Sequence, residues 1–285
     1  MEPQNVSFRV AREDLVTSVG WVARNLPTKP TQPVLRAMLI TADDEGLELA
    51  GYDYEVSTRV RVSAEVAVPG RIAVAGKILS EIIGTLPNKP VDFRLDGSKV
   101  LVSCGSASFE LPSIPLDDYP PLPSLPERTG SINPKLFTEA VTQVASAAGK
   151  DDSLPMLTGV NMEIHGNQIS LAATDRFRLA LRTFEWDPAS SDIEAKLLIP
   201  AKTLLENART LDTGLNEEIG IAVGAGEQVG REGLFGIRTD NRESTTRMLD
   251  ADFPNIQPLL QGTHRDRLGG DCPTARRRAS CLPGG

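Results

Sequence analysis

The chain has few of the residues on which catalytic and metal sites most often depend. Among its 285 residues are two histidines, three cysteines and 5% aromatic side chains. His165 falls in a predicted hairpin turn and His264 close to the C-terminal end, so neither has a serine or cysteine partner in a recognised motif. No group of cysteines and histidines has the spacing of a zinc site. We therefore expect a protein that is not an enzyme and that uses no metal and no cofactor.

Long hydrophobic runs and a leader peptide are also lacking. No apolar run approaches the ~20 residues that cross a bilayer, and residues 1–5 have neither the basic start nor the apolar stretch of a secretory signal. Two of the cysteines, Cys272 and Cys281, stand close to the C-terminal end, which suggests no disulfide framework. These absences predict a cytoplasmic protein with no membrane partner.

Positive charge is in deficit, because 30 Lys and Arg stand against 38 Asp and Glu, a net charge of -8. Such a balance argues against nucleic acid as a partner unless the basic residues gather on one surface. Several of them do follow predicted helices or their ends: Arg12, Arg24, Lys29, Lys77, Lys89, Lys135, Lys150, Lys202 and Arg209. Taken singly, each is more simply a solvated helix face. Together they predict a locally basic surface that holds a phosphate backbone without reading its bases.

Two stretches of the chain have the same design, which indicates an internal duplication. Asp53 and Asp175 take the same place in residues 49–56 and 172–179, each a tight corner between alternating strands. Further matched landmarks follow in the same order: residues 33–35 with 155–157, 72–79 with 197–205, and 116–120 with 249–254. A catalytic pair of the two aspartates is the less favoured reading. We expect each to hydrogen-bond within its own turn.

Each copy predicts strands combined with helices, an α+β fold. Apolar residues at helical spacing mark helices over residues 12–26, 77–86 and 133–144, and alternating runs mark the strands between them. The proline-rich residues 112–126 predict an extended linker. We therefore expect domains at residues 1–126 and 127–262.

The last stretch, residues 263–285, differs in character from the rest. It holds five Arg and two Asp but no Val, Ile, Phe, Tyr or Trp. It could be a basic tail that binds nucleic acid, a disordered end, or a stretch translated out of frame. We favour the out-of-frame reading, because the composition changes where a third repeat would begin.

Four motifs in this order resemble the β sliding clamp of bacterial DNA polymerase III, over about Phe8 to Leu260. They are Ala173-Thr174-Asp175-Arg176-Phe177-Arg178-Leu179, Leu157-Thr158-Gly159, Ile199-Pro200-Ala201-Lys202 and Asp252-Phe253-Pro254. The resemblance implies tandem DNA-clamp domains, with helices lining an inner basic face and antiparallel sheets outside. It also implies a processivity factor whose homodimeric ring, three domains to a subunit, encircles double-stranded DNA independently of sequence. Its expected partners are the DNA polymerase III alpha subunit, the clamp loader and other proteins with clamp-binding motifs.

The resemblance also implies site residues. Lys29, Lys77 and Lys202 match basic positions that face DNA, and the helix pattern adds Arg24 and Arg209. In the family, domain two forms half of a cleft that binds partner peptides. Six residues of this chain match that half: Leu157, Thr174, Arg178, Leu179, Pro254 and Leu259. Phe177 and Pro258 depart from the family, which often has His and Arg there. Phe109 and Leu111 match the edge strand of the dimer contact.

A third clamp domain is not recognisable in this sequence. We therefore expect a truncated chain that does not close a ring and that has an exposed apolar edge at Phe109 and Leu111. The alternative is a non-enzymatic, two-domain peptide-binding module that does not encircle DNA. An enzyme is a more distant alternative.

Overall fold

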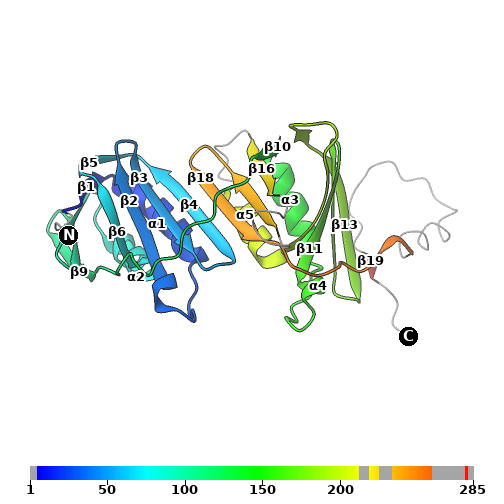
Figure 1. Ribbon diagram of the computed structural model, residues 1–285, viewed down its shortest axis with the longest axis horizontal. Helices are drawn as coiled ribbons and strands as arrows, with labels where there is room; N and C mark the ends of the chain where they lie inside the picture. The colour runs from blue at the N-terminus through cyan, green and yellow to red at the C-terminus, as the bar shows by residue number, and fades with distance from the viewer. Residues whose placement is uncertain (1–4, 212–217, 225–232, 259–279, 282–285) are drawn as a thin grey trace. The chain divides into compact units, whose positions relative to one another are not determined.

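The computed structural model describes residues 5–211, 218–224, 233–258 and 280–281. The chain forms two compact units (Figure 1). Unit 1 consists of Met1–Leu125 with Gly236–Thr246, and unit 2 of Pro126–Phe235 with Arg247–Gly285. Both units combine helices with antiparallel sheets, so the predicted α+β class is confirmed. None of the described helices is long and apolar enough to cross a membrane.

Each unit contains a pair of packed helices. The pair is α1 (Arg12–Asn25) and α2 (Gly76–Thr85) in unit 1, and α3 (Pro134–Ala145) and α5 (Ala201–Leu211) in unit 2, which also has the short α4 (Pro155–Thr158). The predicted helices are thus confirmed. As expected of a helix start, the side chain of Asn133 accepts a hydrogen bond from the N–H of Leu136 at 3.1 Å. Ile78 is one of the apolar residues at helical spacing that marked α2 in the sequence, but 51% of its surface is exposed.

Unit 1 holds two groups of paired strands. One has the order β5-β1-β7-β8-β9 and the other β18-β4-β3-β2-β6. The bounds are β1 (Ser7–Val10), β2 (Ala37–Asp43), β3 (Gly46–Tyr52), β4 (Val56–Val62), β5 (Ala64–Val68), β6 (Gly70–Ala75), β7 (Val91–Asp96), β8 (Lys99–Cys104), β9 (Ala107–Pro112) and β18 (Arg242–Arg247), with a 3-10 helix at Pro33–Arg36.

Unit 2 repeats this arrangement. Its strand orders are β15-β11-β12-β13-β19 and β14-β10-β16-β17. The bounds are β10 (Arg128–Ile132), β11 (Gly159–His165), β12 (Gln168–Thr174), β13 (Arg178–Glu185), β14 (Asp187–Pro188), β15 (Glu194–Pro200), β16 (Ile219–Gly224), β17 (Leu234–Arg238) and β19 (Ser280–Cys281).

The structure contains a second level of repetition that the sequence did not indicate. Each of the four packed helices is directly preceded by one strand and followed by at least three more. Within a unit, the strand before one helix pairs with the first strand after the other helix. The pairs are β1 with β7 and β6 with β2 in unit 1, and β10 with β16 and β15 with β11 in unit 2. Each unit is therefore two similar halves that exchange strand partners.

The proline-rich segment that was predicted as a linker packs against the sheet of unit 1. The N–H of Ile114 donates to the carbonyl of Ala73 at 2.8 Å. Four side chains then cover Leu39 and three alanines of β2, β3 and β6: Ile114, Leu116, Tyr119 and Leu122. In unit 2 the N–H of Leu249 donates to the carbonyl of Leu198 at 2.8 Å, and the following residues reach Phe253 on the sheet. The two sequence echoes at 116–120 and 249–254 thus cover equivalent strand edges.

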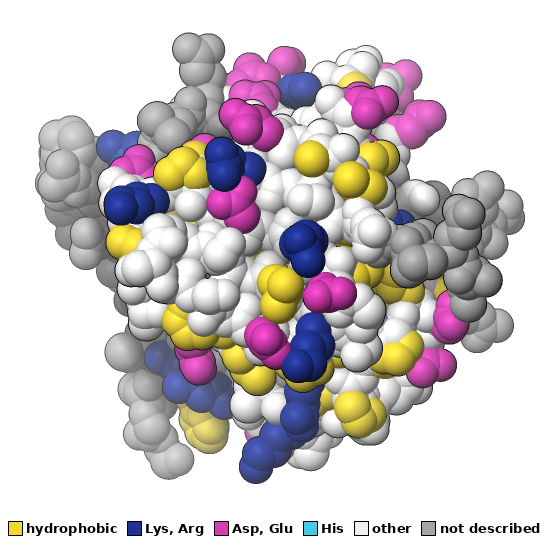
Figure 2. All heavy atoms as spheres, turned by 90° about the vertical axis from the view of Figure 1, so that its left-hand side faces the viewer, with side chains coloured by type: hydrophobic (Ala, Val, Ile, Leu, Met, Phe, Trp, Pro, Cys, Tyr) yellow, Lys and Arg dark blue, Asp and Glu magenta, His cyan; other side chains and the backbone are white. Residues whose placement is uncertain are grey.

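The described residues on the face shown in Figure 2 form no large apolar patch. Hydrophobic side chains appear there in small separate groups among lysines, arginines and acidic residues (Figure 2). The outer surface of the β5-β1-β7-β8-β9 sheet has mixed charge in the same way, with ion pairs between Arg9 and Asp92 at 2.7 Å and between Lys99 and Glu110 at 2.6 Å. Exposed pairs of this kind contribute little to stability, because solvent screens their charges.

Candidate functional site

The two aspartate corners have the same geometry. The Oδ1 of Asp53 accepts hydrogen bonds from the N–H groups of Glu55 (3.0 Å) and Val56 (2.7 Å). The Oδ1 of Asp175 accepts from the N–H groups of Phe177 (3.1 Å) and Arg178 (3.0 Å). The prediction that each aspartate stabilises its own turn is confirmed.

Both corners hold a non-glycine residue in the left-handed region. The φ angle is 75° at Tyr54 and 79° at Arg176. This conformation is unfavourable for a residue with a Cβ, so it persists only where surrounding contacts enforce it. In unit 2 two more bonds do so, because Thr174 Oγ1 donates to the carbonyl of Arg178 at 2.8 Å and accepts from the N–H of Arg176 at 3.2 Å. The corner thereby presents Phe177 with 78% of its surface exposed.

Burial alone would raise the pKa of Asp175, but the hydrogen bonds from Arg178 and from the N–H groups of Arg178 and Phe177 outweigh it and hold the pKa below its usual value. A lowered pKa in the folded state means that the ionised carboxylate stabilises unit 2 above the unfolded pKa, about 3.9. That contribution is lost as the pH falls through the folded pKa.

We expect this corner to make stability dependent on pH. At neutral pH the native chain should resist urea better than Asp175→Asn. The difference should narrow as the pH falls from about 5 to about 2, because Asp175 is protonated first in the unfolded and then in the folded state. Urea unfolding followed by fluorescence measures this when both chains also carry Trp21→Phe, because Trp186 in unit 2 is then the remaining tryptophan. A difference that stays constant over the whole range contradicts the assignment.

The predicted cleft residues that lie in the described part gather at one end of the β11-β12-β13 sheet. Because these strands are antiparallel neighbours, the start of β11, the end of β12 and the start of β13 meet there. Thr174 and Leu179 face each other in register, and Leu157, 6% exposed, lies in α4 just before β11. Pro254 follows Phe253, which packs on Ala172 of β12. Arg178, the remaining residue of this set, forms an ion pair with Asp175 at 2.8 Å, and Leu259 lies outside the described residues.

In unit 1 the predicted DNA-facing residues lie near one another. Lys77, at the start of α2, donates from Nζ to the hydroxyl of Thr28 at 2.7 Å, next to the exposed Lys29. Arg24 is exposed at the end of α1. Burial and then the nearby charge of Arg24 lower the pKa of Arg242, which lies over the ring of Trp21 with 5.4 Å to the centroid. Cationic groups are thus concentrated at this end of the helix pair.

In unit 2 the two predicted basic residues share one helix. Lys202 and Arg209 are exposed and stand seven positions apart on α5, which places them on the same face. The helices are less uniformly basic than expected, because they also carry acidic residues: Glu13, Asp14, Glu81, Glu139 and Glu206. The basic character is local to the helix ends.

The predicted dimer residues lie on β9, the last strand in its sheet order. Leu111 is 5% exposed and Phe109 is half-buried, so the expectation of an exposed apolar edge is wrong for these side chains. They face the core because alternate residues of β9 point inward, whereas Ser108 and Glu110 point out. In the described part of the chain, β9 has a strand partner, β8, on one side only.

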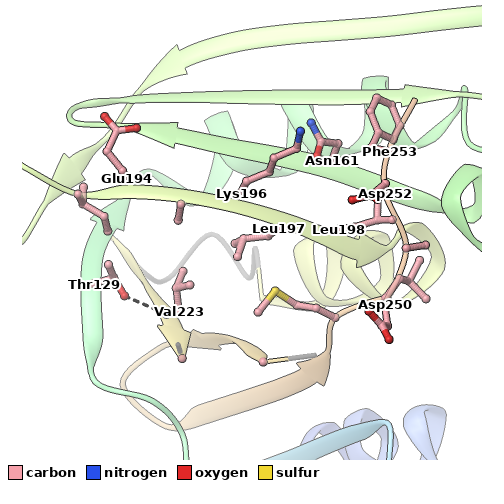
Figure 3. A pocket seen from close by; sticks show the side chains of 17 residues that line it. Thr129, Asn161, Glu194, Lys196, Leu197, Leu198, Val223, Asp250, Asp252 and Phe253 are labelled. Carbon is pink, nitrogen blue, oxygen red and sulfur yellow. Dashed lines mark hydrogen bonds between the residues drawn. The ribbon is translucent and has the colours of Figure 1, made fainter. Parts of the chain in front are cut away.

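A groove of about 690 Å³ lies in unit 2 beside β15, and no sequence motif indicated it. Figure 3 shows Glu194, Lys196 and Asn161 on its upper side, Thr129 and Val223 on its lower side, and Asp250 and Asp252 on the segment that follows β18. The available signal was the buried polar Asn161 within an apolar strand. The described residues contain no group of three or more metal-ligating side chains.

Two family models match the chain. The model of the DNA polymerase III beta subunit, N-terminal domain, matches residues 6–123, and that of the central domain matches residues 131–255. The chain belongs to the DNA polymerase III beta subunit family. The sliding-clamp resemblance and the clamp fold predicted from the sequence are therefore confirmed.

Relatives and solved structures agree with this assignment. The chain is 44% identical to the beta sliding clamp of Streptomyces coelicolor over 255 residues, covering 90% of this chain and 67% of that protein. It is 41% identical to the beta sliding clamp of Micrococcus luteus, with 90% and 80% covered. The crystal structure of the DNA polymerase sliding clamp from Bacillus subtilis matches with a TM-score of 0.82 at 27% identity, over 90% of this chain and 67% of that one.

Proposed function

We propose that the chain acts as a DNA sliding clamp subunit of bacterial DNA polymerase III, which encircles duplex DNA and tethers polymerase and repair proteins to it. The observation that carries this is the match of both units, in order, to consecutive clamp domains. The mechanism is topological: a closed ring cannot leave the duplex sideways, while loose phosphate contacts let it slide. Such a subunit is an accessory protein without a catalytic site of its own, working in the cytoplasm.

The DNA contacts in this proposal come from the ends of the helices. In unit 1 the residues that contact DNA are Arg24, Lys29 and Lys77, and in unit 2 they are Lys202 and Arg209. Four of these side chains are exposed, and Lys77 is half-buried with its ammonium at Thr28. Lysine and arginine on phosphates give affinity without sequence preference, and each phosphate that they neutralise releases counterions.

Charge reversal should test these contacts. The variant Arg24→Glu, Lys29→Glu, Lys77→Glu is expected to bind a blunt duplex at least about tenfold more weakly at low salt, because it removes three phosphate partners. The slope of log affinity against log salt should also become shallower by roughly one for each phosphate partner that is removed. Fluorescence anisotropy of labelled duplex measures both.

A matched control uses three cations of the mixed-charge outer sheet. Arg9→Glu, Arg94→Glu, Lys99→Glu changes the net charge equally but alters residues that pair with Asp92, Asp96 and Glu110. It should weaken binding by much less. If both variants lose the same affinity, the helix ends have no special role and only net charge matters.

For the partners, we propose that Leu157, Thr174, Arg178, Leu179 and Pro254, together with Leu259, form the cleft half that binds clamp-binding motifs. The DNA polymerase III alpha subunit and the clamp loader are the expected partners. The convergence of the cleft residues at one end of a sheet supports this assignment of the cleft.

We take residues 1–126 and 127–262 as the two clamp domains and 263–285 as a separate tail, with Phe109 and Leu111 on the dimer edge.

The oligomeric state separates the ring from its alternative. A stable dimer in light scattering at micromolar concentration supports a ring-forming subunit and contradicts the expectation from the sequence that this chain does not close a ring. A monomer that binds a clamp-binding peptide, but does not stay on circular DNA after loading, supports the non-encircling two-domain peptide-binding module.

A further inference from the structure

The equivalent strand edges of the two units are covered differently. In unit 1, Leu39 pairs across the strands with Ala73 and is 2% exposed under the apolar cover of residues 114–122. In unit 2 the same place is taken by Asn161, which pairs with Leu198. The groove of about 690 Å³ lies beside it (Figure 3). The strand edge that is covered by apolar side chains in unit 1 is thus open and lined by polar groups in unit 2.

Part of the edge of β15 is available for pairing. Leu198 directs its carbonyl away from β11, because that oxygen accepts from the N–H of Leu249. Alternate residues of an antiparallel strand direct both backbone polar groups to the same side. Glu194 and Lys196 therefore also direct their N–H and C=O groups away from β11. No described residue forms a backbone hydrogen bond with these groups.

Asn161 adds a buried acceptor at the inner end of the groove. The residue is 5% exposed and lines the groove. Its Nδ2 donates to Glu163 Oε1 at 3.2 Å, while its Oδ1 is buried and accepts no hydrogen bond within the described part of the chain. An unpaired buried acceptor is unfavourable. A donor supplied from outside the chain would relieve it.

Some charged side chains that line the groove have an ion-pair partner and others do not. Lys196 forms an ion pair with Glu163 at 3.4 Å, and Glu194 contacts the imidazole of His165. Asp250 and Asp252 are both exposed, and neither has an ion-pair partner among the described residues. The wall of the groove opposite the strand edge is therefore negative.

We propose that this groove binds an extended peptide segment that carries lysine or arginine. The segment adds a strand to β15 through the backbone groups of Lys196, and its cation lies against Asp250 and Asp252. Main-chain pairing supplies affinity and the carboxylates supply selectivity. The site uses other residues than the cleft half at Leu157 and Thr174, and it goes beyond the proposed clamp function because it requires neither DNA nor a ring.

Two blocked peptides test the proposal on the full chain labelled with ¹⁵N. One alternates valine with lysine, and its matched partner alternates valine with glutamate. The basic peptide should shift the amide signals of Lys196 and Leu198 and the side-chain amide of Asn161, while the acidic peptide leaves them unchanged. Equal binding of both peptides overturns the proposal, as do shifts confined to Thr174 and Leu179.

Matched variants separate the two parts of the site. Asp250→Asn, Asp252→Asn should weaken binding of the basic peptide about fivefold to tenfold. The equivalent change in unit 1, Asp117→Asn, Asp118→Asn, should leave it unaltered. Lys196→Pro, which removes one edge N–H, should abolish the shift at Leu198, with an unchanged melting temperature showing that the fold is kept. Undiminished binding to both groove variants contradicts the assignment.

Discussion

Replacing Trp21 with alanine should strongly destabilise unit 1 and leave the stability of unit 2 unchanged. Trp21 is fully buried on α1 and has Arg242 over its ring. Truncation of a buried tryptophan costs about 3–5 kcal/mol, because it loses both transfer free energy and packing. That is a large fraction of the roughly 5–15 kcal/mol by which a domain is usually stable.

The chain offers a clean way to measure this, because it has two tryptophans and each unit contains one. In Trp21→Ala the fluorescence of Trp186 reports unit 2 alone, while far-ultraviolet circular dichroism reports both units. We expect the urea midpoint from Trp186 to stay in place and an earlier transition to appear in circular dichroism. Trp21→Phe, which keeps an aromatic ring, should lower the stability of unit 1 much less. If the urea midpoint from Trp186 shifted as far as the early transition in circular dichroism, the two units would unfold together.

Replacing Asp175 with alanine should both destabilise unit 2 and disable partner binding. The side chain accepts from two backbone N–H groups and from the Nε of Arg178. Its loss exchanges these exposed hydrogen bonds for bonds to water, at about 1 kcal/mol, and releases the left-handed conformation of Arg176. Since Thr174, Arg178 and Leu179 are held by this corner, a fluorescent clamp-binding peptide should bind at least about tenfold more weakly.

Asp53→Ala is the matched control. It removes the same two backbone hydrogen bonds from the equivalent corner of unit 1. Its stability loss should be similar, but peptide affinity should be unchanged. If Asp53→Ala weakens the peptide as much as Asp175→Ala does, the effect reflects general destabilisation and the corner does not position the cleft.

The features that could be predicted from the sequence are local in the chain. The Asp53 and Asp175 turns and the helices depend on residues a few positions apart, and the four motifs in their order identify the family. The exchange of strands between half-units and the burial of Leu111 depend on contacts between distant segments. Periodicity shows which residues alternate, but it does not show which strand lies beside them.

The same reasoning explains why the groove and part of the basic surface were not predicted. In the sequence, Asn161 is one polar residue in a strand. Only the strand pairing shows that Asn161 beside Leu198 takes the place that Leu39 beside Ala73 takes in unit 1. Likewise, the contact of Lys77 with Thr28 joins residues that are 49 positions apart. The amphipathic pattern of α2 placed Ile78 inside, although one flank of the helix is open.

The exchange of strand partners within each unit has a consequence for folding. A half-unit, such as β1, α1 and the strands β2 to β5, keeps the pairing of β1 with β5. It lacks β7 beside β1 and β6 beside β2, and the other half supplies both strands. Neither half can complete a sheet alone, so each unit must fold cooperatively from segments far apart in sequence, and high contact order slows that step. A backbone cut between β5 and β6 would yield two fragments that become ordered only on mixing.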